Sequence, residues 1–258
     1  MNALLATVLA CLSGGVLATA AAAGTLVLPP SRIGRLVSFA VGALLGAVFL
    51  ELLPHALEHG APQGVMITVL CGLLAFFLLE KLVLWRHSHG EAEASAHPHG
   101  HVPGELHDSG RSGLMILIGN SVHNFCDGIV IAASFLANPA LGIATTVAII
   151  AHAIPQQVGD FAILIMSGFR RSKAFAYNVA TGSATLLGGL VGYLFLARME
   201  DLLPTVLALA AASLLYVSVA DLIPALHRRA EPLETAKQLV LIGLGIGVIA
   251  LVHVLLEP

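Results

Sequence analysis

Metal-ligating residue types recur at helical spacing within two apolar stretches of the chain. In the first stretch, His123 and Asp127 lie four residues apart with Asn124 beside them, so one helix face carries an imidazole, an amide and a carboxylate. Borderline-soft divalent transition metals accept all three ligand types. Because ionisable groups inside apolar stretches are costly in lipid and mark ion paths, this stretch predicts part of an intramembrane metal site.

The second stretch repeats the pattern around a proline. His152, Gln156 and Asp160 follow one another at four-residue intervals and form a single stripe. Pro155 has no N–H and its ring clashes with the carbonyl of Ala151, so we expect that carbonyl to be freed beside His152. Interrupted helices near the membrane midplane are a recurring way to build ion sites in transporters.

We expect these two helices to face each other across one ion. Gln156 would then be an oxygen ligand beside three residues that surround a single point: His123, Asp127 and His152. The alternative is a polar contact that only fastens the helices together, and two histidines, an acid and a proline make it the weaker interpretation. Gly119 and Gly128 are predicted to let another helix approach closely.

Two further groups of polar residues lie toward the ends of apolar stretches. One has the same helical spacing and comprises Glu51, His55, Glu58 and His59. We expect Glu51 and His55 to form an entrance that draws cations in, although anchoring at the membrane interface is an equal alternative and fits Glu58 and His59 well. Asp221, near the end of a later stretch, is a candidate for the exit.

The composition indicates that the solvent of most of the chain is lipid. Hydrophobic residues make up 57 % and charged residues only 10 % of the sequence, whereas a soluble domain carries about 25 % charged residues. The formal net charge of −3 gives no basic stripe, so a nucleic-acid partner is not expected. The fold class is therefore an all-α integral membrane protein, a single transmembrane domain over residues 1–258.

Stretches of about 20 mostly apolar residues predict eight membrane-spanning helices. Their ranges are 3–28, 36–57, 64–85, 112–137, 141–167, 174–197, 203–225 and 237–256. No Lys or Arg precedes Arg32, so we expect the first range to be a span and not a signal peptide. Every Lys and Arg except Arg198 falls on the connections that lie on one side, which predicts that this side is cytoplasmic and that both termini are outside.

The connection between the third and fourth predicted spans differs from the rest of the chain. Residues 86–111 combine Gly, Pro and acidic residues with histidines at 87, 89, 97, 99, 101 and 107. Such a segment cannot bury a core, so we expect a flexible cytoplasmic loop. Loose, exchangeable metal binding is favoured over a plain solvated linker, and its ligands would be His87, His89, His97, His99, His101 and His107.

The two polar stretches resemble signatures of the ZIP family of zinc/iron-regulated metal transporters. HNFCDGIVIAASF (His123–Phe135) resembles the HN-x-x-DG signature of the family's fourth span. HAIPQQVGDFAIL (His152–Leu164) resembles the HE-x-P-x-E-x-GD signature of the fifth span in its histidine-rich subfamily. The eight predicted spans and the His-rich loop also match, so the resemblance extends over essentially the whole chain.

The resemblance implies an inverted-repeat bundle with a metal path between spans four and five. The primary metal site maps onto His123, Asp127, His152 and Gln156, and a second metal position onto Asn124, Asp127, Ala153 and Gln156. Ala153 and Gln157 stand where the subfamily signature has glutamates, so a single-metal site is favoured over a binuclear one. The implied cargo is Zn²⁺, with Fe²⁺, Mn²⁺ and Cd²⁺ as alternatives, and no cofactor is expected.

The sequence therefore predicts a protein that imports divalent metal ions across the plasma membrane and is not an enzyme. Its expected partners are the metal ion and the lipid bilayer, and a homodimer is left open. One alternative is a zinc exporter of the cation-diffusion type, but such proteins resemble six spans followed by a soluble metal domain. The other is an intramembrane metal-dependent hydrolase. The sequence lacks the His-Glu-x-x-His signature of zinc proteases, and Asp160 is the only candidate for a general base.

Overall fold

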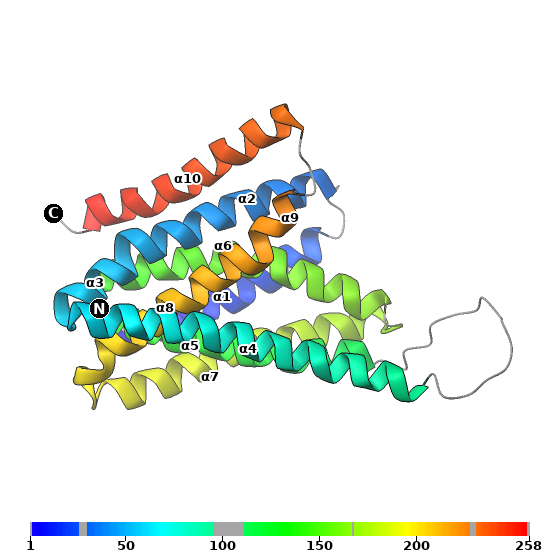
Figure 1. Ribbon diagram of the computed structural model, residues 1–258, viewed down its shortest axis with the longest axis horizontal. Helices are drawn as coiled ribbons and strands as arrows, with labels where there is room; N and C mark the ends of the chain where they lie inside the picture. Colours follow the sequence, from blue (N-terminus) through cyan, green and yellow to red (C-terminus); the bar gives the residue numbers. More distant parts are fainter. Residues whose placement is uncertain (1, 26–29, 95–110, 167, 228–230, 257–258) are drawn as a thin grey trace, which may run out of the picture.

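The chain folds into a bundle of long helices in this computed structural model. The structure describes residues 2–25, 30–94, 111–166, 168–227 and 231–256. These residues are almost entirely helical and contain no strand. The predicted all-α class is confirmed, and Figure 1 shows the helices running along one common direction.

The helices follow one another with short connections. Their bounds are α1 (Ala3–Thr25), α2 (Pro30–Gly46), η1 (Ala47–Leu52), α3 (Leu53–His59), α4 (Pro62–Ala94), α5 (Arg111–Ala137), α6 (Pro139–Met166), α7 (Arg171–Leu196), η2 (Glu200–Leu202), α8 (Leu203–Tyr216), η3 (Val217–Leu222), α9 (Ile223–His227) and α10 (Pro232–Leu256). The elements α2, η1 and α3 form one continuous helical run, as do α8, η3 and α9.

Seven helical segments in the described residues are long and apolar enough to cross a membrane. Within its described residues, the 27-residue α5 does not contain such a segment. The helix that contains the third predicted span continues past residue 85 to Ala94, which places the backbone of His87 and His89 within a helix.

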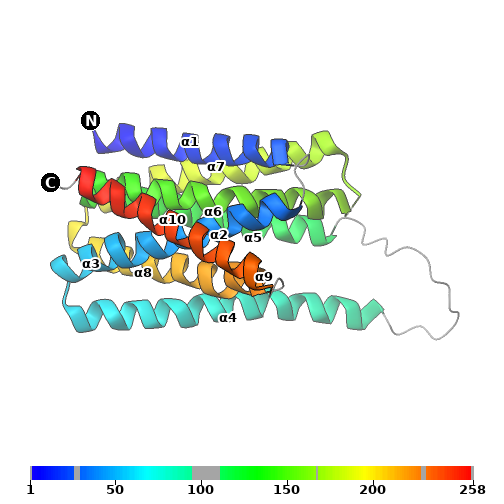
Figure 2. The ribbon, with the colours of Figure 1, turned by 90° about the horizontal axis from the view of Figure 1, so that it is seen from above.

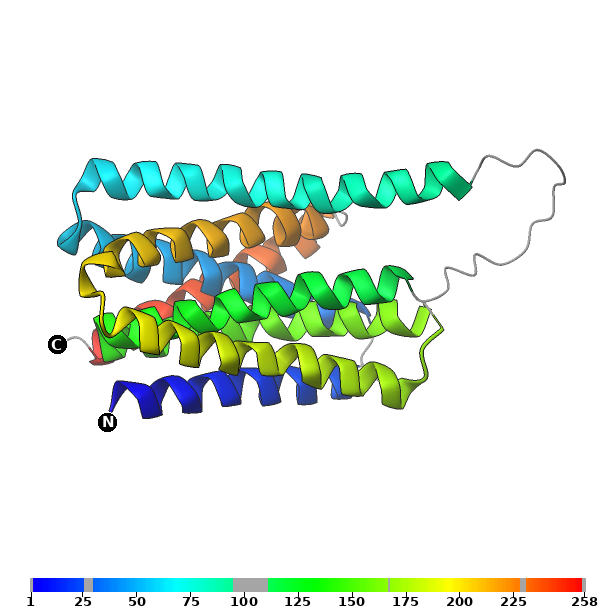
Figure 3. The same cartoon turned by 90° about the horizontal axis from the view of Figure 1, so that it is seen from below.

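The arrangement leaves α5 and α6 between outer helices. Figure 2 shows α4 along one side of the bundle and α1 along the other, and Figure 3 shows the same order from the opposite direction. The start of α1 and the end of α10 lie at one end of the bundle, which we call the terminal end. The end of α4 and the start of α5 lie at the opposite end.

Glycines bring α5 and α7 into close contact. A Cβ atom on Gly128 would overlap the backbone of Thr185 in α7, and a Cβ atom on Gly188 would overlap the backbone of Phe125 in α5. The prediction for Gly128 is therefore confirmed. The prediction for Gly119 is wrong, because nothing lies within 4 Å of a Cβ atom built there. Helical spacing alone does not show which of the two glycines packs against α7.

Two π-helical turns, η1 and η3, interrupt the longer helical runs just before a proline. The N–H of Leu53 bonds to the carbonyl of Val48, and the N–H of Ile223 bonds to the carbonyl of Ser218, each five residues back. Pro54 and Pro224 come next and have no N–H to offer. Turns of this kind insert an extra residue and so rotate the face presented by the residues around them.

Candidate metal site

The two signature helices meet at three ligand atoms. The Nε2 atoms of His123 and His152 are 3.3 Å apart, and Asp127 Oδ2 lies 3.6 Å from the first and 3.5 Å from the second. His152 and Asp127 are almost fully buried, while the side chain of His123 is 21 % exposed. These residues form one of the groups in the described part of the chain whose ligand atoms cluster closely enough to hold a metal ion.

A short hairpin sets this meeting. Only Asn138 separates α5 from α6, and its side-chain oxygen accepts a hydrogen bond of 2.7 Å from the N–H of Ala140 at the start of α6. Pro139, the first residue of α6, needs no N–H partner there. The two helices therefore run antiparallel directly after the turn, and residues equally far from Asn138 lie level with each other.

The hydrogen bonding of His152 aims one ring nitrogen at the centre of the group. Its Nδ1 lies 3.3 Å from the carbonyl oxygen of Ala148, which can only accept a hydrogen bond. The Nδ1 atom therefore carries the proton of the neutral ring, and Nε2 keeps a free lone pair. A hydrogen bond of this kind on the far side of the ring is the usual way in which a metal-binding histidine is oriented.

The distances match the ligand triangle of a tetrahedral zinc ion. Zinc lies about 2.0–2.2 Å from nitrogen and carboxylate-oxygen ligands, so two ligands of a tetrahedral ion are about 3.3–3.6 Å apart. The three distances here are 3.3, 3.5 and 3.6 Å. In addition, Asp127 Oδ2 is buried and accepts no hydrogen bond from the described residues. A cation at the centre would satisfy this oxygen.

The remaining predicted ligands surround this group but do not join it through the contacts that the structure gives. Asn124 donates from Nδ2 to the carbonyl of Thr181 in α7, at 3.1 Å. Gln156 donates from Nε2 to Asn120 Oδ1 at 3.4 Å. Asp160 is buried and lies farther along α6. Asn124 thereby ties α5 to α7, and Gln156 ties α6 to α5.

Gln157 faces away from the ligand group. Its side-chain oxygen accepts a 3.0 Å hydrogen bond from Thr19 in α1, and its backbone carbonyl accepts one of 3.1 Å from Asn178 in α7. Ala153 is buried beside His152. The resemblance leads one to expect glutamates at positions 153 and 157. Instead, the neutral Ala153 packs beside His152, and the neutral Gln157 is hydrogen-bonded to Thr19.

The group is shielded from the terminal end of the bundle. Farther along α5 in that direction, the side chains of Ile131, Ser134 and Phe135 are buried. In the other direction, Asn120 and Ser121 are only partly buried, as is His123 itself. The exposed side of the group thus points toward the end of the bundle at which α5 begins.

The two predicted entrance residues differ in the surroundings that the structure gives them. Glu51 is buried in η1, and its Oε1 lies 3.3 Å from Nδ1 of His253 in α10. His55 instead lines a pocket at the terminal end together with His59. Glu51 lies in a π turn, whereas the predicted four-residue spacing assumed a regular helix through it. The side chain of Asp221 and residues His97, His99, His101 and His107 lie outside what the structure describes.

Sequence reasoning missed two contacts of these residues. His253 had no assigned role, and only its place as a lone histidine in the last apolar stretch could have drawn attention to it. For Glu58 and His59 the sequence analysis favoured interfacial anchoring as an alternative, and it did not predict that their ligand atoms cluster with that of His55.

The fold and the buried ligand group together define a multi-pass membrane protein built around a metal-binding centre. Comparison with known families agrees: the model described as "ZIP Zinc transporter" matches residues 1–253. The chain belongs to this ZIP family.

Curated relatives point the same way. The chain is 32 % identical to zinc transporter ZIP13 of Pongo abelii, over 85 % of this chain and 66 % of that protein. It is 33 % identical to zinc transporter ZIP13 of Homo sapiens, over 85 % of this chain and 70 % of that protein. It is 32 % identical to the zinc transporter ZIP13 homolog of Drosophila melanogaster, over 86 % and 78 %. The chain thus spans 66–78 % of the length of these relatives.

Proposed function

We propose that this chain carries divalent transition metal ions, zinc in the first place, across a membrane into the cytoplasm. His123, Asp127 and His152 hold the ion on its way. The observation that carries this proposal is the triangle of ligand atoms with sides of 3.3, 3.5 and 3.6 Å, buried inside the bundle and matching tetrahedral zinc. Names of the relatives support zinc as the cargo.

The site holds a single ion. Asp127 is the only carboxylate of the ligand group, and Ala153 and Gln157 add no charge beside it. Asn124, Gln156 and Asp160 line the path next to the ion, where amide and carboxylate oxygens can replace water during entry to and release from the triangle. Because two of the three ligands are neutral imidazoles, Fe²⁺, Mn²⁺ and Cd²⁺ remain candidates that competition must separate from zinc.

The membrane orientation follows from the positive residues. Both termini lie outside and the His-rich segment 86–111 lies in the cytoplasm, where its histidines bind metal loosely. The plasma membrane is the proposed location. Eight spans and an inverted repeat are supported by the two matching runs α2–η1–α3 and α8–η3–α9, in which AVFLELLP (47–54) parallels VSVADLIP (217–224) with a π turn before each proline.

The experiment that tests the function is metal uptake into vesicles or cells that contain the protein. Zinc entering against a control without the protein is the expected result, and cobalt, iron, manganese and cadmium are then offered in competition. Net movement outward would favour the cation-diffusion type of exporter instead. Absence of transport together with zinc-dependent cleavage of a membrane peptide would favour a hydrolase.

A further inference from the structure

A second cluster of metal-ligating side chains lies at the terminal end of the bundle, away from the site above. His55, Glu58 and His59 occupy the last two turns of α3, and one ligand atom from each lies within 4.8 Å of the others. Their spacing of three and four residues places them on one face of the helix. Two imidazoles and a carboxylate are the same ligand types as in the buried group.

Hydrogen bonding orients the outermost ring. His59 Nδ1 lies 3.0 Å from the carbonyl oxygen of His55, which can only accept, so Nδ1 of the neutral ring is protonated. The lone pair of His59 is therefore on Nε2, the nitrogen that faces away from the helix backbone. The two rings also stack, with centroids 4.5 Å apart and an angle of 27° between their planes. The backbone bond and the stacking together fix the ring before any ion arrives.

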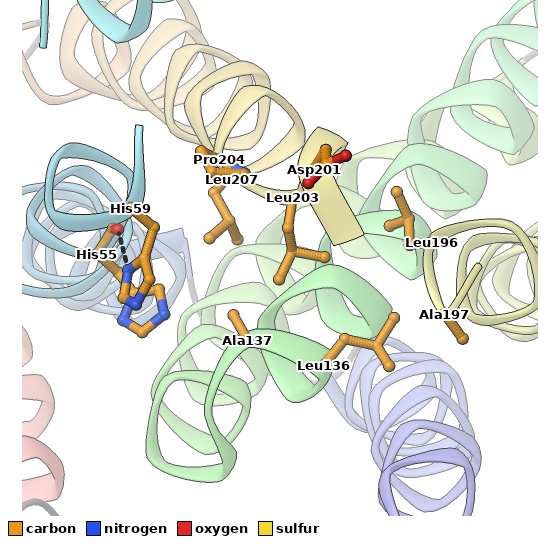
Figure 4. A pocket seen from close by; sticks show the side chains of 10 residues that line it. All are labelled: His55, His59, Leu136, Ala137, Leu196, Ala197, Asp201, Leu203, Pro204 and Leu207. Carbon is orange, nitrogen blue, oxygen red and sulfur yellow. Dashed lines mark hydrogen bonds between the residues drawn. The ribbon is translucent and has the colours of Figure 1, made fainter. Parts of the chain in front are cut away.

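These histidines form one wall of a pocket of about 540 Å³. Figure 4 shows His55 and His59 side by side, with the carboxylate of Asp201 on the wall across from them. The floor is apolar and includes Leu136 and Ala137 at the end of α5. A pocket with apolar walls and a few acidic groups concentrates cations near its mouth.

The pocket lies above the buried group on the same helix. Leu136 is nine residues beyond Asp127 on α5, which corresponds to about 14 Å along the helix axis. Between them, the side chains of Ile131 and Ser134 are fully buried. An ion in the pocket and an ion in the buried triangle would therefore occupy two separate places, divided by a packed layer.

We propose that His55, Glu58 and His59 form a second metal site, which binds the transported divalent cation on the outer side while the packed layer of α5 keeps it from the buried triangle. The nature of the cation and the outer placement rest on the proposed function; the ligand cluster itself does not. Asp201 lines the pocket and adds a negative charge to that of Glu58, which raises the local concentration of metal ions.

Direct binding separates this site from the other metal ligands of the chain. The protein is purified in full length with the histidines of segment 86–111 changed to serine, and with His123→Ala and His152→Ala in the same background. Zinc bound at equilibrium is then counted. We expect this background protein to bind one zinc equivalent. Adding His55→Ala together with His59→Ala should remove that zinc equivalent. His227→Ala is the matched control, since His227 ends α9 as His59 ends α3 and is likewise exposed. An unchanged zinc count in the double variant overturns the proposal.

Transport gives an independent readout. With the buried site intact, His59→Ala is expected to raise the external zinc concentration for half-maximal uptake by about tenfold, in line with the loss of an oriented ligand, while the maximal rate is kept. The His227→Ala control should behave as the parent protein. A concentration dependence identical in both variants contradicts a role in capture. If the parent protein moves no metal, the proposed function fails, and the zinc count still decides whether the outer site exists.

Discussion

His123 and His152 lie level with each other because they are nearly the same distance from the hairpin at Asn138. His123 comes 15 residues before this turn and His152 comes 14 residues after it. Each helix rises about 1.5 Å per residue, so both positions are about 21–23 Å from the turn. Their Nε2 atoms meet at 3.3 Å as a result. A one-residue connection thus brings two histidines that are distant in the sequence together in the candidate metal site.

Removing a ligand from the triangle should nearly abolish transport. Loss of a group that merely orients a metal ligand costs about 10–100-fold, so His152→Ala is expected to reduce zinc uptake by more than about 100-fold. His123→Ala and Asp127→Ala should act in the same direction. Uptake is normalised to the amount of protein in the membrane, and Cys71→Ala, on an exposed face of α4, is the control. Near-normal uptake by the His152→Ala protein would show that α6 does not ligate the ion.

The α5–α7 contact should be sensitive to a single methyl group. A Cβ atom at Gly128 overlaps backbone atoms of α7, which cannot rotate away, so Gly128→Ala is expected to lower the free energy of unfolding by about 1–3 kcal/mol. Gly119→Ala is the control on the same helix, because its Cβ atom would meet nothing within 4 Å. Unfolding of the purified protein in detergent measures both. Equal stability of the two variants would mean that α5 and α7 are not in contact as described.

The sequence was sufficient to predict the helices and the meeting of His123, Asp127 and His152. Helical spacing placed His123 and Asp127 on one face, and the apolar ranges located the hairpin that brings His152 beside them. The helices and the meeting of these residues depend on local periodicity and on a short connection, and both properties can be read along the chain.

Positions that depend on distant neighbours were not predictable in the same way. The partner of Glu51 is His253 in the last helix, and a π turn determines which direction Glu51 faces. Gln157 is held by Thr19 in the first helix, which no local pattern connects with it. Gly119 and Gly128 have the same chemistry, and only the course of α7 distinguishes them.

The topology can be tested with cysteines placed on the two proposed sides. In a background without Cys11, Cys71 and Cys126, an impermeant maleimide should label Pro258→Cys in intact cells and Ser95→Cys only after permeabilisation. The reason is that all Lys and Arg residues except Arg198 fall on the side that contains residue 95. Labelling of both positions from the same side would eliminate the eight-span arrangement.

The charge of the buried site should determine how tightly it holds the ion. A divalent ion ligated by Asp127 and two neutral histidines keeps about one net positive charge, and an uncompensated charge away from water costs several kcal/mol. Such a site binds weakly and releases quickly. Uptake can still proceed, because an inside-negative potential of about 100 mV favours inward movement of a doubly charged ion by roughly 4.6 kcal/mol.

Adding a carboxylate next to the triangle should therefore tighten binding. Gln156 lies one turn beyond His152 and is half-buried, and Ala153 is buried beside His152, so Gln156→Glu and Ala153→Glu both place a negative charge close to the ion. We expect each to lower the zinc concentration for half-maximal uptake and to slow the maximal rate, because release from a neutralised site is slower. Gln157→Glu is the control, since that side chain is bonded to Thr19 in α1 and not directed at the ligands. If Gln156→Glu and Ala153→Glu leave the apparent affinity at the level of the Gln157→Glu protein, these two positions do not face the ion, and the correspondence between α6 and the family signature must be shifted.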